Sequence, residues 1–172
     1  MNILVTGGAG YIGSHVVEEL KKSGFTPIVY DNLSTGHAAA VPEDVQLVEG
    51  DIHDVAFARH IMEQFSIDAV MHFAASSLVG ESMENPAKYY FNNVEGTLHL
   101  LEAMRGAGVD RMVFSSTAAV YGEPEQVPIC EDSKLSPTNV YGRSELMIEN
   151  MLADYDMAYE MKYVALRYFN AA

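Results

Sequence analysis

Short apolar runs of strand length alternate along the chain with longer stretches of helical periodicity. The runs are Asn2–Thr6, Pro27–Asp31, Val45–Glu49, Ala69–Phe73, Arg111–Ser115 and Tyr163–Arg167. They are nearly continuous in apolar residues, as expected for parallel strands that are covered on both faces. The helical stretches between them are Tyr11–Ser23, Val55–Phe65, Pro86–Ala107 and Asn139–Glu160. This alternation predicts right-handed crossovers and therefore an α/β fold with a doubly wound parallel sheet.

Composition favours a single globular domain with an acidic surface. The 172 residues suit one domain, and 49% hydrophobic residues argue against disorder although the net charge is −14. The acidic balance disfavours nucleic acids and anionic membranes as partners. The single cysteine, Cys130, indicates a reducing compartment and is expected to be buried or inert among neighbouring carboxylates. Without a membrane-length apolar run or a signal peptide, we expect a cytoplasmic protein.

A glycine-rich loop follows the first predicted strand. Gly7, Gly10 and Gly13 are spaced three residues apart, and a predicted helix begins within the motif. The first glycine permits a tight turn, the second lets the backbone approach a pyrophosphate, and the third lets helix and strand pack closely. The helix N-terminus then faces the anion. Because the strand and the helix are both present, the loop predicts a dinucleotide site, with a purely structural turn as the alternative.

The residue that ends the second predicted strand indicates which dinucleotide is bound. Asp31 lies eighteen residues after Gly13, where a carboxylate can accept from both hydroxyls of an adenosine ribose. The same carboxylate repels a 2′-phosphate, which favours NAD over NADP. A loop-capping role for Asp31 is the alternative. Asp51 and Ile52 follow the third strand and could reach the adenine, although a turn-capping aspartate fits Asp51 equally well.

Hydroxyl groups gather after the fifth predicted strand. Ser115, Ser116 and Thr117 end this strand at the carboxyl edge of the sheet, where ligands of such folds bind. The segment 122–138 contains three prolines and is predicted to be a loop over the same edge. Tyr141 then opens the last predicted helix. The six histidines show no spacing typical of a metal site, so no metal is expected.

Taken together, these motifs resemble the extended short-chain dehydrogenase/reductases and, among them, the UDP-glucose 4-epimerase family. The matching segments cover the whole chain and are 6–13, 31–36, 50–52, 72–75, 79–82, 92–94, 115–117, 120–122 and 167–170. The resemblance implies a Rossmann-type sheet that is truncated after its sixth strand. It also implies that residues 1–172 form an NAD-binding domain and that the C-terminal substrate region of the family is absent.

The resemblance also implies a role for particular residues. Tyr141 resembles the base that removes the sugar O4 proton while the C4 hydride passes to NAD, and Thr117 resembles the hydroxyl that hydrogen-bonds O4. The implied cofactor contacts are Gly7, Gly10, Tyr11, Ile12, Gly13, Asp31, Asn32, Asp51, Ile52, Phe73, Ala74, Ala75, Asn93, Ser115 and Tyr141. The implied contacts with a UDP-sugar are Ser116, Thr117, Tyr141, Tyr168, Phe169 and Asn170. The implied reaction interconverts UDP-glucose and UDP-galactose through a transient 4-keto sugar.

One residue departs from the family's Tyr-x-x-x-Lys pair, because the chain has Glu145 where the lysine is expected. A free tyrosine titrates at about 10, so a base at neutral pH needs a nearby cation. At roughly 6 Å and an effective dielectric of about 20, one unit charge is worth about 3 kcal/mol, or about 2 pKa units, and an anion reverses the sign. Taken alone, Glu145 would be a solvated helix residue. The alternatives to an active enzyme are therefore a non-catalytic NAD-binding module or an incomplete fragment.

The helix that begins near Tyr141 carries a further expectation. Met147 and Met151 lie four residues apart and share one of its faces. In the family that this chain resembles, such a face joins two subunits. A homodimer is therefore an expected assembly.

Overall fold

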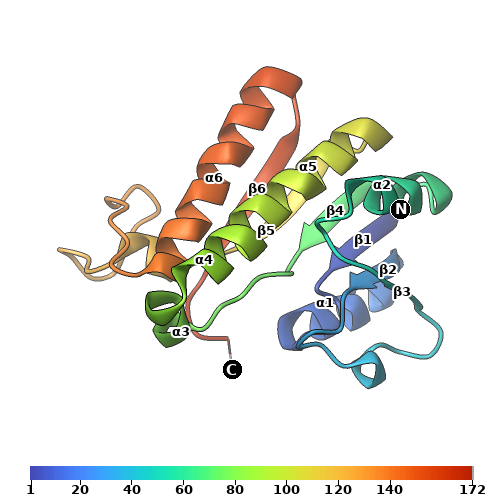
Figure 1. The fold of residues 1–172 in the computed structure, drawn as a ribbon, viewed down its shortest axis with the longest axis horizontal. Coiled ribbons are helices and arrows are strands. Elements are labelled where there is room, and N and C mark those ends of the chain that lie inside the picture. The colour runs from blue at the N-terminus through green and yellow to red at the C-terminus, as the bar shows by residue number, and fades with distance from the viewer. Residues whose placement is uncertain (172) are drawn as a thin grey trace.

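The computed structural model describes residues 1–171 and shows one six-stranded sheet (Figure 1). The strands are β1 (Asn2–Thr6), β2 (Thr26–Asp31), β3 (Gln46–Glu49), β4 (Ala69–His72), β5 (Arg111–Thr117) and β6 (Lys162–Tyr168). They lie in the order β3-β2-β1-β4-β5-β6, and every neighbouring pair is parallel. This is the strand order of the Rossmann fold, so the predicted fold class is confirmed.

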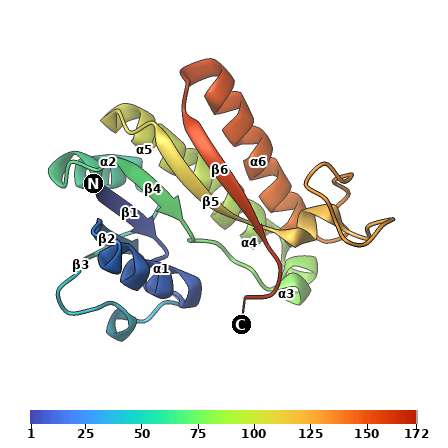
Figure 2. The same cartoon turned by 180° about the vertical axis from the view of Figure 1, so that it is seen from behind.

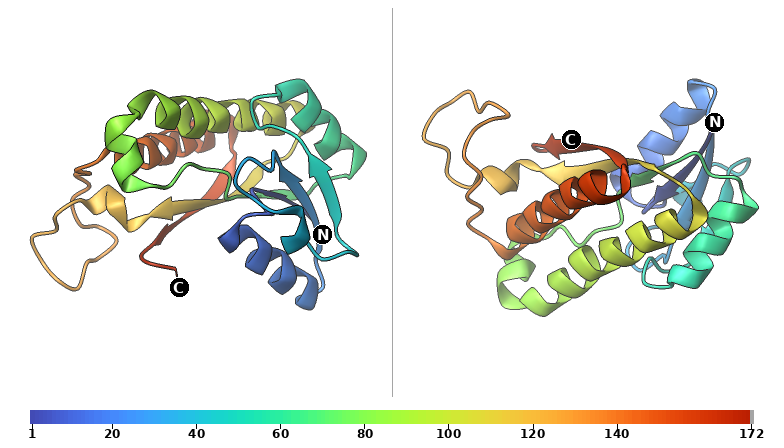
Figure 3. Two further views of the ribbon diagram at one scale, coloured as in Figure 1. Left: turned by 60° about the horizontal axis from the view of Figure 1, so that its bottom comes forward. Right: turned by 90° about the horizontal axis from the view of Figure 1, so that it is seen from above.

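Helices lie on both faces of the sheet. The helical elements are α1 (Tyr11–Lys22), η1 (Ala38–Ala40), α2 (Val55–Gln64), α3 (Val79–Glu84), α4 (Pro86–Tyr89), η2 (Tyr90–Glu95), α5 (Gly96–Ala107), η3 (Ala118–Tyr121) and α6 (Val140–Tyr159). Helix α1 covers one face, whereas α2, α5 and α6 lie on the other (Figure 3). Every strand and helix that the sequence predicted is present within two residues of its predicted bounds, except the stretch Pro86–Ala107.

The stretch Pro86–Ala107 is three elements instead of the single predicted helix. Between α4 and α5 lies η2, a π-helix, whose wider turn carries the fully buried side chain of Asn93. The Asn93 amide donates to the carbonyl oxygen of Ser76 at 2.9 Å, and its oxygen accepts from the Ser76 N–H at 2.8 Å. Because Ser76 belongs to the loop after β4, the π-turn ties this loop to the helical layer.

The central strand β1 is buried from both sides. Leu4 packs into the cluster beneath α2, α5 and α6, whereas Val5 packs into the cluster beneath α1, and neither is exposed. This double burial accounts for the nearly continuous apolar runs of the inner strands.

The edge of the sheet at β6 is less covered. Helix α1 lies over β1 and β2, and in the part of the chain that the structure describes no helix covers β6 on that face (Figure 2). As a result Val164 is 54% exposed and Leu166 is 38% exposed.

The region between β5 and α6, residues 122–138, is an irregular loop as predicted. The expectation for Cys130 was a buried or inert thiol; Cys130 lies exposed in this loop, so it is not buried, and its inertness stays a prediction. Among residues 1–171, no helix combines the length and apolar character needed to cross a membrane.

Candidate active site

The glycine loop between β1 and α1 brings three backbone segments into close contact. Gly7 has a positive φ of 71°, and a Cβ atom there would lie 2.6 Å from the backbone nitrogen of Ala74. A Cβ atom on Gly13 would lie 2.2 Å from the carbonyl oxygen of Gly7. The loop is held by hydrogen bonds from Gly7 N to Tyr30 O at 3.0 Å and from Gly10 N to Gly7 O at 3.1 Å. Glycine is therefore required sterically at positions 7 and 13.

Helix α1 begins at this loop without a capping side chain. Its N-cap is Gly10, and within the described residues no side chain accepts from the first-turn N–H groups and no acidic residue lies in that turn. The N–H groups at the start of a helix carry a partial positive charge and favour an anion. The backbone around Tyr11 and Ile12 is thus suited to a pyrophosphate, as the sequence predicted.

Asp31 ends β2 beside the glycine loop and is nearly buried. Its Oδ2 accepts from the Ala9 N–H at 2.9 Å, and its Oδ1 accepts from the Leu33 N–H at 2.8 Å. Asp31 therefore does cap the local loop, which was the alternative role. A carboxylate has about four acceptor positions, so two remain for the hydroxyls of a ribose. The structure is thus compatible with both roles at once.

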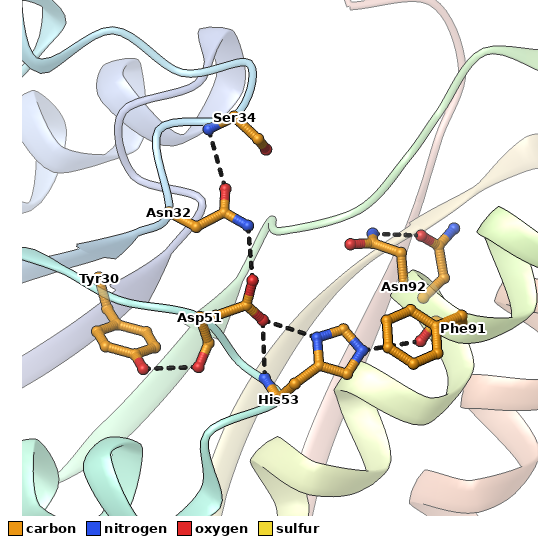
Figure 4. A network of polar contacts seen from close by, with 8 residues as sticks. Tyr30, Asn32, Ser34, Asp51, His53, Phe91 and Asn92 are labelled. Carbon is orange, nitrogen blue, oxygen red and sulfur yellow. Dashed lines mark hydrogen bonds and ion pairs between the residues drawn. The ribbon is translucent and has the colours of Figure 1, made fainter.

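Asn32, Asp51 and Ile52 lie at the same end of the sheet, at the carboxyl ends of β2 and β3. The Asn32 amide donates to Asp51 Oδ2 at 3.0 Å (Figure 4). The Ile52 side chain is buried and lies against Gly96 of α5, so only its backbone is available to a ligand.

The segment after β4 borders the glycine loop. The Phe73 N–H donates to Thr6 O at 2.9 Å, and Ala74 lies against Gly7. Ala75 is exposed, and the neighbouring Ser76 is held by Asn93. The predicted cofactor contacts of this segment therefore line the same edge as the glycine loop.

The three hydroxyl residues at the end of β5 divide between the two faces of the strand. Ser115 and Thr117 are half-buried on one face, and the Thr117 hydroxyl accepts from the Ala119 N–H at 3.1 Å. Ser116 points to the opposite face, because side chains alternate along a strand. It is buried there and donates to Glu149 Oε1 at 2.5 Å. The substrate contact predicted for Ser116 stays a prediction, but its hydroxyl is already engaged on the side away from Thr117.

Tyr141 lies in the first turn of α6. The helix begins with Asn139, whose side chain accepts from the Gly142 N–H at 2.7 Å, and the Tyr141 ring meets that of Tyr89 edge to face at 6.5 Å. Burial raises the pKa of Tyr141 above its usual value; a charge on Glu145 would raise the pKa further, and the nearby Thr117 hydroxyl opposes the rise. The structure thus brings together Tyr141 and Thr117, as predicted, but leaves the phenol strongly protonated at neutral pH.

Glu145 lies one helical turn after Tyr141 and is 0% exposed, so the expectation of a solvated residue is wrong. The reason is that α6 packs against η2 at this turn, where Glu145 Oε1 accepts from the Asn93 amide at 3.4 Å. Its other oxygen is buried and has no hydrogen-bond partner among the described residues. Burial raises the pKa of Glu145 well above its usual range, and the Glu149 carboxylate adds to the rise.

The high pKa of Glu145 corrects the expected electrostatic effect on Tyr141. The sequence predicted an anion beneath the phenol. Burial favours the neutral form of the Glu145 carboxyl, so Tyr141 lacks a supporting cation and the repulsion expected from an anion is reduced. Desolvation is then the main obstacle to ionising the phenol.

The buried carboxyl predicts a pH-dependent stability. The folded chain retains on Glu145 a proton that the unfolded chain releases above about 4.5, so the free energy of unfolding falls as pH rises from there toward the folded pKa. Glu145→Gln removes this loss because an amide does not ionise. We expect its melting temperature to exceed that of the unchanged chain at pH 8 and to match it near pH 4. At pH 8 the difference is about 2–4 °C for each kcal/mol that the substitution adds to the free energy of unfolding.

Circular dichroism melts at pH 4, 6 and 8 measure this effect. Glu84→Gln is the matched control, because Glu84 is exposed and its substitution should leave the pH dependence unchanged. An equal difference between Glu145→Gln and the unchanged chain at all three pH values would contradict the buried neutral acid.

Glu149, one turn further along α6, is paired with Arg167 of β6. The guanidinium donates to Glu149 through Nε at 3.0 Å and through a terminal nitrogen at 2.7 Å. It also donates to the hydroxyl of Tyr121 at 2.8 Å and to the carbonyl oxygen of Glu131 at 3.1 Å. Arg167 thus forms a bidentate pair with Glu149 and, through the Glu131 carbonyl oxygen, ties the 122–138 loop to the end of β6.

The remaining predicted residues lie nearby. Tyr168 is half-buried at the end of β6, and Phe169 and Asn170 follow it, both exposed. His72 is buried between the hydroxyls of Thr6 at 2.6 Å and Thr97 at 2.9 Å. Burial lowers the pKa of His72 to about 4, so it is neutral and has a packing role. No group of three or more metal-ligating side chains occurs among residues 1–171.

Comparison with known proteins gives a consistent result. Residues 3–172 match the model of the NAD dependent epimerase/dehydratase family. The chain is 52% identical to the UDP-glucose 4-epimerase of Lacticaseibacillus casei over 172 residues, which is all of this chain and 52% of that protein. It is 55% identical to the UDP-glucose 4-epimerase of Halalkalibacterium halodurans, of which it covers 51%.

Solved structures agree with the sequence relatives. The UDP-glucose 4-epimerase from Brucella ovis in complex with NAD superimposes with a TM-score of 0.96 at 54% identity, over 98% of this chain and 52% of that one. The UDP-glucose 4-epimerase from Bifidobacterium longum in complex with NAD+ and UDP gives a TM-score of 0.94 at 38% identity, over 99% of this chain and 53% of that one. The chain therefore spans about half the length of the relatives it matches.

Proposed function

The chain belongs to the NAD dependent epimerase/dehydratase family, and we propose that it binds NAD and supplies the tyrosine of a UDP-glucose 4-epimerase. The observation that carries this proposal is the glycine loop. Gly7 and Gly13 admit no side chain, and the loop places the uncapped start of α1 beside Asp31 at one edge of the sheet. This combination of an anion site and a ribose acceptor matches the two halves of an adenosine diphosphate.

The residues of the chain fit NAD along the carboxyl edge of the sheet. In the proposed complex the first-turn N–H groups of α1 hold the pyrophosphate, and Asp31 accepts from the adenosine ribose. Asn32, Asp51 and the backbone of Ile52 lie where the adenine would extend. When bound, NAD supplies a reversible hydride acceptor for C4 of the sugar.

The proposed substrate is a UDP-sugar, interconverted between the glucose and galactose forms. Tyr141 removes the proton from O4, and the Thr117 hydroxyl hydrogen-bonds the same oxygen. The exposed Phe169 and Asn170 provide the first contacts with the nucleotide part. The free thiol of Cys130 is compatible with the proposed cytoplasmic location, where thiols are kept reduced.

A second candidate function is NAD retention without turnover. Glu145 favours it, because a buried acid provides no cation to stabilise the Tyr141 phenolate. A coupled assay separates the two candidates. The chain is incubated with NAD and UDP-galactose at neutral pH, and UDP-glucose is measured with a UDP-glucose dehydrogenase. Formation of UDP-glucose rules out NAD retention without turnover. Saturable NAD binding without any formation of UDP-glucose rules out the epimerase activity.

We also propose that the chain self-associates through α6. Met147 is 48% exposed on this helix, whereas Met151 packs partly against the core. An exposed methionine beside a packed helix face is typical of an adaptable apolar contact. Light scattering at high protein concentration tests the assembly, and a mass that stays monomeric contradicts it.

A further inference from the structure

Asp51, at the end of β3, is held by an unusually complete set of donors (Figure 4). Its Oδ2 accepts from the Asn32 amide at 3.0 Å, and its Oδ1 accepts from both the backbone N–H of His53 at 2.9 Å and the ring Nδ1 of His53 at 2.7 Å. The Tyr30 hydroxyl donates to the Asp51 carbonyl oxygen at 2.7 Å. Partial burial works against ionisation of Asp51, but these hydrogen bonds lower its pKa overall. Asp51 is therefore a fixed carboxylate.

His53 makes a second set of contacts on its other side. Its Nε2 lies 3.1 Å from the carbonyl oxygen of Phe91, and the two rings are stacked with centroids 4.3 Å apart and planes at 12°. Phe91 belongs to the π-helix η2, so His53 joins the end of β3 to this helix. The ring of His99 from α5 meets His53 edge-on at 5.7 Å and completes the enclosure.

Both ring nitrogens of His53 thus face an oxygen that can only accept. A ring nitrogen that carries a hydrogen can donate to such an oxygen. The His53 ring therefore links two parts of the fold, because Nδ1 contacts the Asp51 carboxylate and Nε2 contacts the carbonyl oxygen of Phe91 in η2.

We propose that His53 is a positioning residue for the nucleotide, holding the Asp51 carboxylate in the place where the adenine of NAD binds. The inference rests on the proposed function and adds to it a residue outside the motifs that carried the resemblance. Its physical basis is preorganisation, because a carboxylate that is already held in place loses less freedom when the ligand binds.

The two nitrogens can be tested separately by substitution. His53→Asn retains a donor near the position of Nδ1, which faces Asp51, and His53→Gln retains one near Nε2, which faces Phe91. His53→Phe retains the stacked ring and loses both donors. His60→Asn is the matched control, because His60 is an exposed histidine on the adjoining helix α2.

Calorimetric titration of each variant with NAD and with ADP is the measurement. Loss of a hydrogen bond to a charged group predicts about tenfold weaker binding of both ligands by His53→Phe and His53→Gln, with His53→Asn and His60→Asn within about threefold of the unchanged chain. Binding of ADP tests the adenine end alone.

Two other outcomes overturn the proposal. An unchanged affinity of His53→Phe for NAD and ADP shows that Asp51 does not need His53 to hold it in position. If all three His53 variants bind NAD and ADP equally weakly, and their melting temperatures fall to the same extent, His53 has a role in folding only. Failure of the unchanged chain to bind either ligand is a separate result, which removes the proposed function and this inference with it.

Discussion

Gly13→Ala is expected to abolish measurable NAD binding, with an affinity at least about 100-fold weaker than that of the unchanged chain. The added methyl group would lie 2.2 Å from the carbonyl oxygen of Gly7 and 2.8 Å from the Cα atom of Gly8. Both neighbours are backbone atoms, so the collision is relieved only by moving α1 away from the glycine loop. The first-turn N–H groups of α1 then no longer lie where they can bind the pyrophosphate.

Two further variants separate the loss of the site from the loss of the fold. Gly80→Ala is the control, since a Cβ atom at Gly80 would lie within 4 Å of no atom in the described part of the chain, and its NAD affinity should not change. Gly10→Ala meets only the Gly7 oxygen at 3.2 Å, so it should fold with a nearly unchanged melting temperature and still weaken NAD binding by crowding the pyrophosphate. Full affinity in Gly13→Ala would contradict the proposed cofactor site.

Glu145→Lys is expected to raise the epimerase rate at neutral pH by about 100-fold. A cation at roughly 6 Å stabilises the Tyr141 phenolate by about 3 kcal/mol, which lowers the pKa of Tyr141 by about 2 units and raises the phenolate population accordingly. Among residues 1–171 the buried second oxygen of Glu145 has no hydrogen-bond partner, so no counter-ion of this part of the chain pairs with it. The Glu149 carboxylate, one turn away, gives the new ammonium a favourable neighbour.

Two readouts check this expectation. The coupled assay reports the rate, and an NMR titration of ring-labelled tyrosine reports the pKa of Tyr141 without requiring turnover. Glu145→Gln is the matched control, because it removes the acid without adding a cation, and it should change both quantities far less than Glu145→Lys does. An increase in rate with Glu145→Gln would show that Glu145 acts as an anion, and an unchanged Tyr141 pKa in Glu145→Lys would refute the charge argument.

The order of strands and helices could be predicted because each depends on local patterns. The run Asn2–Thr6 is apolar throughout, since β1 is buried on both faces, and its predicted bounds match the observed strand. The glycine loop carries its steric requirement in its own residues, so Gly7 and Gly13 could be identified from their spacing between a predicted strand and a predicted helix. Where geometry is determined by neighbours in sequence, pattern reasoning was sufficient.

Other features depend on tertiary contacts that a single sequence does not reveal. The π-turn at η2 follows from the pairing of Asn93 with Ser76, seventeen residues away, so the apolar period of Pro86–Ala107 gave no sign of it. Helix α3 has only six residues, too few to show a period. The short helical turns η1 and η3 were likewise not predicted.

The site shows the same division. The family resemblance implied that Tyr141 and Thr117 act together, and the structure places the Thr117 hydroxyl close to Tyr141. The burial of Glu145 was missed, since a glutamate in a helix is ordinarily solvated and only the packing of α6 against η2 buries it. Alternation along β5 could have indicated that Ser116 faces away from Thr117. The contact of His53 with Phe91 spans 38 residues and left no local signal.

The most direct test of the account is calorimetric titration of the chain with NAD. An intact cofactor site predicts saturable binding close to one NAD per chain, weakened by Gly13→Ala and unaffected by Gly80→Ala. No binding by the unchanged chain would contradict it, because the glycine loop and Asp31 would then form a structural turn without a cofactor.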